Sequence, residues 1–163
     1  MSEWLGRLRQ ILRSGRIPPS QGEVSSLPAA TPAGRPPVSP PALAYLGDAL
    51  YELYVRARLL EAHPTDPGKL HALAVERVRA EAQARALQSL VPSLNKAELD
   101  LVRRARNRKT RTRPRSSPAE YSRSTGLEAL VGHLFLTGQD ERLADLLRTA
   151  YVAGEEAPAP SPK

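Results

Sequence analysis

The sequence predicts an all-α fold of about five main helices within residues 41–151. Apolar residues recur there at intervals of three and four, the spacing that places them on one face of a helix. No stretch convincingly alternates apolar and polar residues as a half-buried strand does. Prolines and glycines separate the periodic stretches. We therefore expect a helical bundle around one hydrophobic core.

The first two predicted helices carry the longest apolar patterns. Residues 42–61 follow two prolines that suit a first helical turn, and their periodic residues are Leu43, Leu46, Leu50, Leu53, Tyr54 and Leu60. A single helix is expected over about 66–89, with Pro67 near its start and Pro92 beyond its end. Its inward residues are predicted to be Leu70, Leu73, Ala74, Val78, Ala82 and Leu87.

Three shorter patterns complete the bundle. A third helix is expected over about 95–106, with Leu99 and Val102 facing inward. A fourth covers about 118–136 and ends at Gly138, and a fifth covers 141–151.

The helical region 41–152 is predicted to be one domain, with a different kind of sequence on each side. Residues 1–40 form an N-terminal amphipathic stretch followed by a segment with eight prolines between positions 18 and 41, which predicts a disordered extension. Residues 153–163 repeat proline, alanine and acid, which predicts a disordered tail.

Composition narrows the classes of function. The chain has 163 residues, a formal net charge of +7, and no cysteine, which excludes disulfides and thiolate chemistry. Its histidines have no zinc-binding spacing. We expect a cytoplasmic protein, since there is neither a secretory signal nor an apolar run of about twenty residues. The positive charge suits a polyanionic partner such as a nucleic acid.

Asp48 and Glu128 are the leading candidates for a metal site. Each stands inside an apolar helical pattern, where an ionised carboxylate is unfavourable unless a cation or strong donors compensate. Glu52 lies one turn after Asp48 on the same helix face and is a candidate supporting acid. Gly47 weakens the first helix, which indicates close approach by another backbone or by substrate.

Each of these acids also has a simpler interpretation. Asp48 would then be solvated, and Glu52 would pair with Arg56 four residues later. Glu128 would be a buried acid paired with an arginine such as Arg123.

A basic segment precedes the Glu128 helix. Residues 103–115 contain eight Lys or Arg and no acid, and the alternation with Thr and Pro predicts a loop rather than a helix. Arginine can grip a phosphate with two parallel hydrogen bonds, so the segment is predicted to bind a nucleic-acid backbone. The alternative is a disordered loop that binds polyanions without selectivity. The predicted RNA-binding residues are Arg106, Asn107, Arg108, Lys109, Thr110, Arg111, Arg113, Arg115 and Arg123.

Three segments together resemble a known family. They are Ala-Leu-Ala-Tyr-Leu-Gly-Asp-Ala at 42–49, Arg-Asn-Arg-Lys-Thr at 106–110, and residues 121–132 with their Ser-Thr-Gly-Leu-Glu-Ala-Leu core. In this order they resemble the ribonuclease III catalytic domain, and more closely its short bacterial branch, Mini-ribonuclease III, which lacks a separate RNA-binding domain. The resemblance spans about 41–151.

The resemblance implies a function as well as a fold. It implies a helical homodimer that uses Mg²⁺ to hydrolyse double-stranded RNA, leaves 5′-phosphate ends, and matures the large-subunit (23S) ribosomal RNA precursor. Asp48 and Glu128 match the family's catalytic metal-binding acids, and Glu52 matches the acid after the Gly-Asp. Two further acids of the full-length enzymes are replaced here by Ala44 and Thr125, a loss that the short branch shares.

Several partners and alternatives follow from this comparison. The ribosomal particle or a ribosomal protein is a candidate partner, and the apolar residues Leu46, Leu50 and Leu53 are candidates for either the dimer interface or the core. A non-catalytic RNA-binding assembly factor on the same fold is the main alternative, which would not need Asp48 and Glu128 inside apolar helices. A helical DNA-binding module is disfavoured because the basic cluster is in a loop.

Overall fold

A computed structural model describes residues 38–62, 66–107 and 118–155 of the chain. These residues form helices and no strand, which confirms the all-α prediction. The α-helices are α2 (Pro40–Ala62), α3 (Pro67–Val78), α4 (Ala80–Leu90), α5 (Lys96–Arg106), α6 (Pro118–Thr137) and α7 (Asp140–Glu155), with a 3₁₀ turn η1 (Val91–Ser93). Nearly all of the predicted extension and most of the predicted tail lie outside the described residues, although 153–155 belong to α7.

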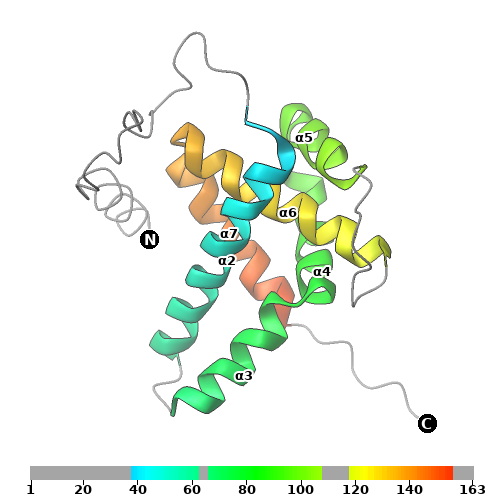
Figure 1. Cartoon of the computed structure of the whole chain (residues 1–163). Helices are drawn as coiled ribbons and strands as arrows, with labels where there is room; N and C mark the ends of the chain where they lie inside the picture. Colours follow the sequence, from blue (N-terminus) through cyan, green and yellow to red (C-terminus); the bar gives the residue numbers. More distant parts are fainter. Residues whose placement is uncertain (1–37, 63–65, 108–117, 156–163) are drawn as a thin grey trace, which may run out of the picture.

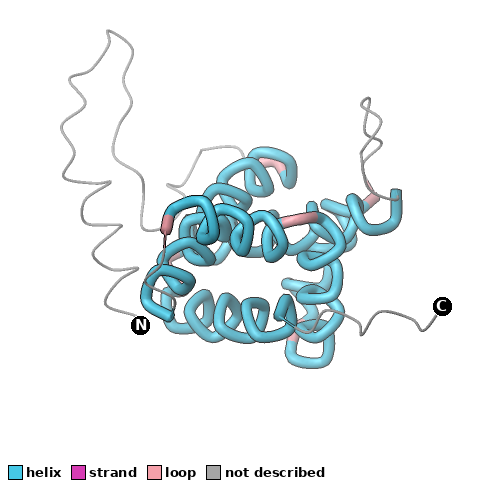
Figure 2. Tube along the Cα trace, turned by 90° about the horizontal axis from the view of Figure 1, so that it is seen from below, coloured by secondary structure: helices cyan, strands magenta, loops and turns pink. Residues whose placement is uncertain are grey.

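Helix α6 is the centre of the bundle (Figure 1). It contacts α2, α4, α5 and α7, while α3 lies against α2, α4 and α7. Leu127, Leu130 and Leu134 of α6 are fully buried in the core. The view from below shows the helices surrounding this core (Figure 2). No helix among the described residues is long and apolar enough to cross a membrane.

Two glycines allow α2 and α6 to cross in backbone contact. A Cβ on Gly47 would lie 1.7 Å from the Glu128 carbonyl oxygen, and a Cβ on Gly132 would lie 2.1 Å from the Leu43 carbonyl oxygen. No side chain fits at either position without moving one helix. The close backbone approach expected from Gly47 is therefore confirmed, and the neighbouring backbone is that of α6.

The single helix predicted over 66–89 is wrong, because the chain is broken at Arg79. Arg79 is extended, with φ −62° and ψ 153°, and it separates α3 from α4. No proline or glycine marks the break. The break at Arg79 changes the direction of the chain, so that α3 packs on α2 while α4 packs on α6 and α7.

The predicted helix starts and inward faces are mostly confirmed. Asp66 caps α3 by accepting hydrogen bonds from the N–H groups of Gly68 and Lys69, and Pro67 occupies its first turn. Gly138 has a φ of 77° and ends α6. Leu73 and Leu99, predicted to face inward, are exposed, since their helices turn Ala74 and Leu101 toward the core instead.

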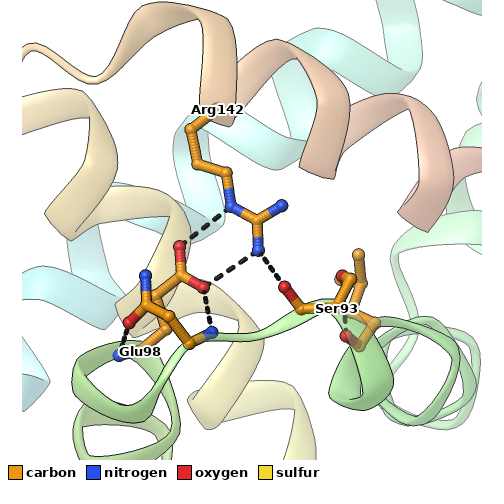
Figure 3. A network of polar contacts seen from close by, with 5 residues as sticks. Ser93, Glu98 and Arg142 are labelled. Atoms are coloured by element: carbon orange, nitrogen blue, oxygen red, sulfur yellow. Dashed lines mark hydrogen bonds and ion pairs between the residues drawn. The ribbon is translucent and has the colours of Figure 1, made fainter.

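An ion pair between the partly exposed Arg142 and the buried Glu98 fixes α7 to the start of α5 (Figure 3). Arg142 donates from Nε to Glu98 Oε1 and from Nη2 to Glu98 Oε2, both at 2.9 Å, and Nη2 also donates to the Ser93 carbonyl at 2.8 Å. Glu98 and Asn95 form a capping box at the start of α5. The Arg142 hydrogen bonds hold the pKa of Glu98 below its usual value, so this carboxylate is charged and fully paired.

Gly47→Ala should destabilise the protein severely, by several kcal/mol, because the added Cβ forces α2 and α6 apart. Gly154→Ala in α7 is the matched control. Its Cβ would approach only Tyr51 Oη, at an ordinary 3.8 Å, so we expect a neutral or slightly stabilising effect. Urea unfolding followed by circular dichroism measures both. Equal stability of the two variants would contradict the helix-crossing argument.

Arg142→Met should lower the free energy of unfolding by about 3 kcal/mol, because it leaves the Glu98 carboxylate buried without its partner. Adding Glu98→Gln should recover part of this loss, since glutamine removes the stranded charge and still forms a capping box. A double-mutant cycle in urea tests the coupling. Additive effects would mean that the pair contributes no interaction energy.

Candidate active site

The contact of α2 with α6 brings the two predicted metal-binding acids together. Asp48 directly follows Gly47, and Glu128 supplies the carbonyl that lies against Gly47. The negative charge of Asp48 is close enough to raise the pKa of Glu128. Residues eighty positions apart in the chain thus form one acidic pair.

Glu128 is the more strongly perturbed member of the pair. Burial raises its pKa most, the negative charge of Asp48 also raises it, and hydrogen bonding to Gln83 lowers it, so that the pKa is about 8. Among the described residues no cationic side chain forms an ion pair with Glu128, so the simpler interpretation, a pair with Arg123, is not what the structure has. A pair of carboxyls without a cation is a suitable place for a metal ion.

Asp48 lies at the edge of the pair and reaches solvent. Partial burial raises its pKa, the negative charge of Glu52 raises it further, and hydrogen bonding to Gln83 lowers it. Glu52 itself accepts a hydrogen bond from Arg56 Nε at 3.1 Å, the i,i+4 partner foreseen in its simpler interpretation. Glu52 therefore raises the pKa of Asp48, while the Glu52 carboxylate itself forms an ion pair with Arg56.

Gln83 of α4 is the site residue that sequence reasoning missed. Its side chain is buried, its Nε2 donates to the Val78 carbonyl at 3.0 Å, and it lowers the pKa of both Asp48 and Glu128. The available signal was a polar residue flanked by Ala82 and Ala84 in a core-facing segment. An uncharged side chain outside the family motifs gave no reason to place it beside the acids.

The positions of the two acids of longer relatives carry no carboxylate here. Ala44 is buried in the core, and Thr125 donates its hydroxyl to the Tyr121 carbonyl at 3.0 Å. Within the described ranges no group of three or more acidic or histidine side chains is arranged to hold a metal. The acidic pair of this site therefore consists of Asp48 and Glu128 alone among the described residues.

Of the basic segment 103–115 only residues 103–107 are described, together with Arg123 beyond it. Arg106 and Asn107 are exposed at the end of α5, and Arg123 lies near the start of α6. Ser122 donates to the Arg106 carbonyl at 2.9 Å, which ties these two helix ends together. The remaining predicted residues, Arg108, Lys109, Thr110, Arg111, Arg113 and Arg115, lie outside the described residues.

The leucines that were candidates for either core or interface differ in their exposure. Leu50 is buried, and Leu46 packs partly buried against the core. Leu53 is 43% exposed, and Tyr45, two turns earlier on α2, is 85% exposed. Helix α2 therefore shows apolar side chains to solvent beside Asp48 and Glu52.

Comparison with known proteins agrees with this geometry. The family model "Ribonuclease III domain" matches residues 41–139, and the chain belongs to the ribonuclease III family. It is 52% identical over 122 residues to the Mini-ribonuclease 3 of Symbiobacterium thermophilum, an alignment that covers 74% of this chain and 92% of that protein. It is 45% identical over 130 residues to the Mini-ribonuclease 3 of Synechocystis, covering 78% and 89%.

A solved structure has a similar fold. The fold is similar to a crystal structure of a Fusobacterium nucleatum protein, with a TM-score of 0.62 and 28% identity, covering 68% of this chain and 88% of that one. The resemblance to the Mini-ribonuclease III branch is thereby confirmed. By family, the chain is an endoribonuclease.

Glu128→Gln should stabilise the metal-free protein at pH 8.5 and have little effect near pH 4. Between pH 4.5 and about 8 the folded protein retains a proton on Glu128 that the unfolded chain releases, so this group lowers stability as pH rises. Thermal unfolding in a chelator, from pH 4 to 9, gives the difference between variant and wild type. A pH-independent effect of Glu128→Gln would contradict the raised pKa.

Proposed function

We propose that this protein is a divalent-metal-dependent endoribonuclease that cleaves double-stranded RNA, with Asp48 and Glu128 as its metal-binding and catalytic residues. One observation carries the proposal: two carboxyls from α2 and α6 share a site, and no cation within the described residues pairs with Glu128. A protein that only bound RNA would have no use for this unfavourable pair.

The residues present fit Mg²⁺. Magnesium prefers oxygen ligands, retains water, and is often held by only one or two carboxylates with substrate phosphate. A bound Mg²⁺ would supply charge stabilisation at a phosphate oxygen and would make a water molecule more acidic. Asp48 and Glu128 would bind the ion, and Glu52 would add negative charge beside Asp48.

The basic residues suit the phosphate backbone of the substrate. Arg106 and Arg123, with the polar Asn107, lie on either side of residues 108–117 in the sequence, and a hydrogen bond from Ser122 ties the ends of α5 and α6 together. Arg123 precedes Glu128 by five residues on α6. Phosphate contacts from this region would orient a duplex relative to the acidic pair.

A homodimer would provide the two sites that cutting both strands requires. Tyr45, Ala49 and Leu53 follow an i, i+4, i+8 row on α2, and all three are exposed. An exposed apolar row of this kind suits a second copy of the chain. Because Asp48 and Glu52 lie next to the row, such an interface would bring two acidic sites near each other.

The more specific role rests on the family resemblance. We propose that the substrate is a duplex of the 23S ribosomal RNA precursor, that the products carry 5′-phosphates, and that the cleavage takes place in the cytoplasm. The ribosomal particle or a ribosomal protein would then present the RNA. Cleavage of a 23S-terminal duplex in preference to a duplex of unrelated sequence would support this substrate.

Asp48→Asn and Glu128→Gln should each reduce the cleavage rate by about 100-fold or more, because each removes a charge that the metal requires. Both variants should still shift the duplex in a gel, since the basic residues are unchanged. Rates are measured on a long RNA duplex with Mg²⁺ and with chelator, and Glu141→Gln serves as the control that retains activity.

The alternative function has a distinct outcome in the same experiment. Duplex binding by the wild-type protein without cleavage, on both generic and ribosomal duplexes, would favour a non-catalytic RNA-binding assembly factor. Cleavage that persists in both acid variants would overturn the assigned residues while the nuclease activity stands.

A further inference from the structure

The end of α5 is held against α6 by a hydrogen bond from a side chain. The Ser122 hydroxyl of α6 donates to the Arg106 carbonyl of α5 at 2.9 Å, between residues that are sixteen positions apart in the sequence. The last four carbonyls of a helix have no donor within that helix, so this bond satisfies a group that would otherwise depend on water. It joins the last turn of α5 to the beginning of α6.

Gly126, one turn further along α6, lets the side chain of Arg106 lie on the same helix. A Cβ on Gly126 would be 3.2 Å from Arg106 Cγ, which is closer than an ordinary van der Waals contact. The stem of Arg106 therefore packs closely against α6, while the residue as a whole is exposed. Long basic side chains often bury the stem in this way and keep the charged group in water. Arg106 is thus held both at its carbonyl and at its stem.

The Arg106 guanidinium is available to a ligand. It forms no ion pair with another described residue, whereas Arg103, three residues earlier on α5, pairs with Asp100 at 3.1 Å. A guanidinium binds phosphate well because its planar fork can donate two parallel hydrogen bonds. A side chain whose stem is already held loses less conformational freedom when it binds. These features suit a pre-organised phosphate contact.

The same contacts connect Arg106 with the helix that carries one acid of the pair. Ser122, Gly126 and Glu128 all belong to α6. Gly126 precedes Glu128 by two residues, about 3 Å along the helix axis. A phosphate bound by Arg106 would therefore be held at a defined place relative to α6 and its carboxyl.

We propose that Ser122 is a positioning residue for substrate binding, whose hydroxyl holds the end of α5 on α6 so that Arg106 presents its guanidinium to a phosphate of double-stranded RNA. Ser122 acts through Arg106 and needs no contact with the RNA. This inference rests on the proposed function, because it takes the RNA duplex as the ligand.

The affinity of the full-length protein for an RNA duplex tests the proposal, measured by fluorescence anisotropy in chelator at several salt concentrations. Arg106→Gln keeps the carbonyl that Ser122 binds. It should lower the affinity about 5–10-fold and reduce the slope of log affinity against log salt concentration by about one, because one phosphate contact is lost. Ser122→Ala should lower the affinity about 3–5-fold, and Ser122→Thr, which retains the hydroxyl, should restore it.

Ser124→Ala is the matched control. Ser124 Oγ donates to the Tyr121 carbonyl at the same 2.9 Å, but both residues belong to α6, so this bond does not reach α5. Loss of this bond removes a hydroxyl of the same kind from the same helix. The duplex affinity of Ser124→Ala should equal that of the wild type.

A double-mutant cycle separates positioning of Arg106 from a general loss of structure. Ser122→Ala should weaken binding in the wild-type protein and have no further effect in Arg106→Gln, because it acts through that arginine. An equal loss in both proteins would overturn the proposal. So would an unchanged affinity of Arg106→Gln, a result that does not depend on how well Ser122→Ala folds.

The outcomes separate this proposal from the proposed function. Wild-type protein that cleaves the duplex, with Ser122→Ala equal to it in affinity, would overturn the role of Ser122 and leave the nuclease intact. Wild-type protein that shows the expected binding pattern but does not cleave with Mg²⁺ would overturn the nuclease and leave the role of Ser122. Wild-type protein that binds no duplex would overturn both.

Discussion

The backbone contact between α2 and α6 is the constraint on which the rest of the structure depends. Gly47 and Gly132 remove the side chains that would keep the two helices apart, so carbonyl oxygens of each helix occupy the space of a missing Cβ on the other. The central helix α6 can then pack against four others. The same contact sets Asp48 beside Glu128. The crossing of α2 and α6 at these glycines therefore determines both the close packing of the two helices and the location of the acidic pair.

Two partly or fully buried acids of the bundle illustrate opposite electrostatic arrangements. Glu98 is held charged by Arg142 and the α5 cap, and its pKa is lowered. Glu128 has burial and a second acid around it, and its pKa is raised to about 8. In the first arrangement the charge of Glu98 is paired by another side chain of the same protein, which stabilises the fold. The second leaves Glu128 without a cationic partner in the described part of the chain, so this carboxyl keeps its proton near neutral pH unless a cation replaces it.

Much of the fold could be predicted from local sequence. Asp66 with Pro67, Asn95 with Glu98, and Gly138 mark helix ends through short-range hydrogen bonds and backbone preferences, and the structure has ends there. The break at Arg79 could not be predicted, because no local residue disfavours a helix at that point. The prediction that Leu73 and Leu99 face inward was wrong for a related reason. Periodicity in the sequence defines an apolar face, but tertiary packing decides how each helix is rotated toward the core.

The sequence by itself determined the helical class, the family motifs and the candidate acids Asp48 and Glu128. Helical periodicity and short motifs depend only on residues that are close together in the chain. Tertiary structure alone decided that Asp48 and Glu128 meet, that Glu128 has no described arginine partner, and that Gln83 lowers the pKa of both acids. These relations depend on where α2, α4 and α6 cross, and the burial that shifts the pKa of each acid exists only after the helices have packed.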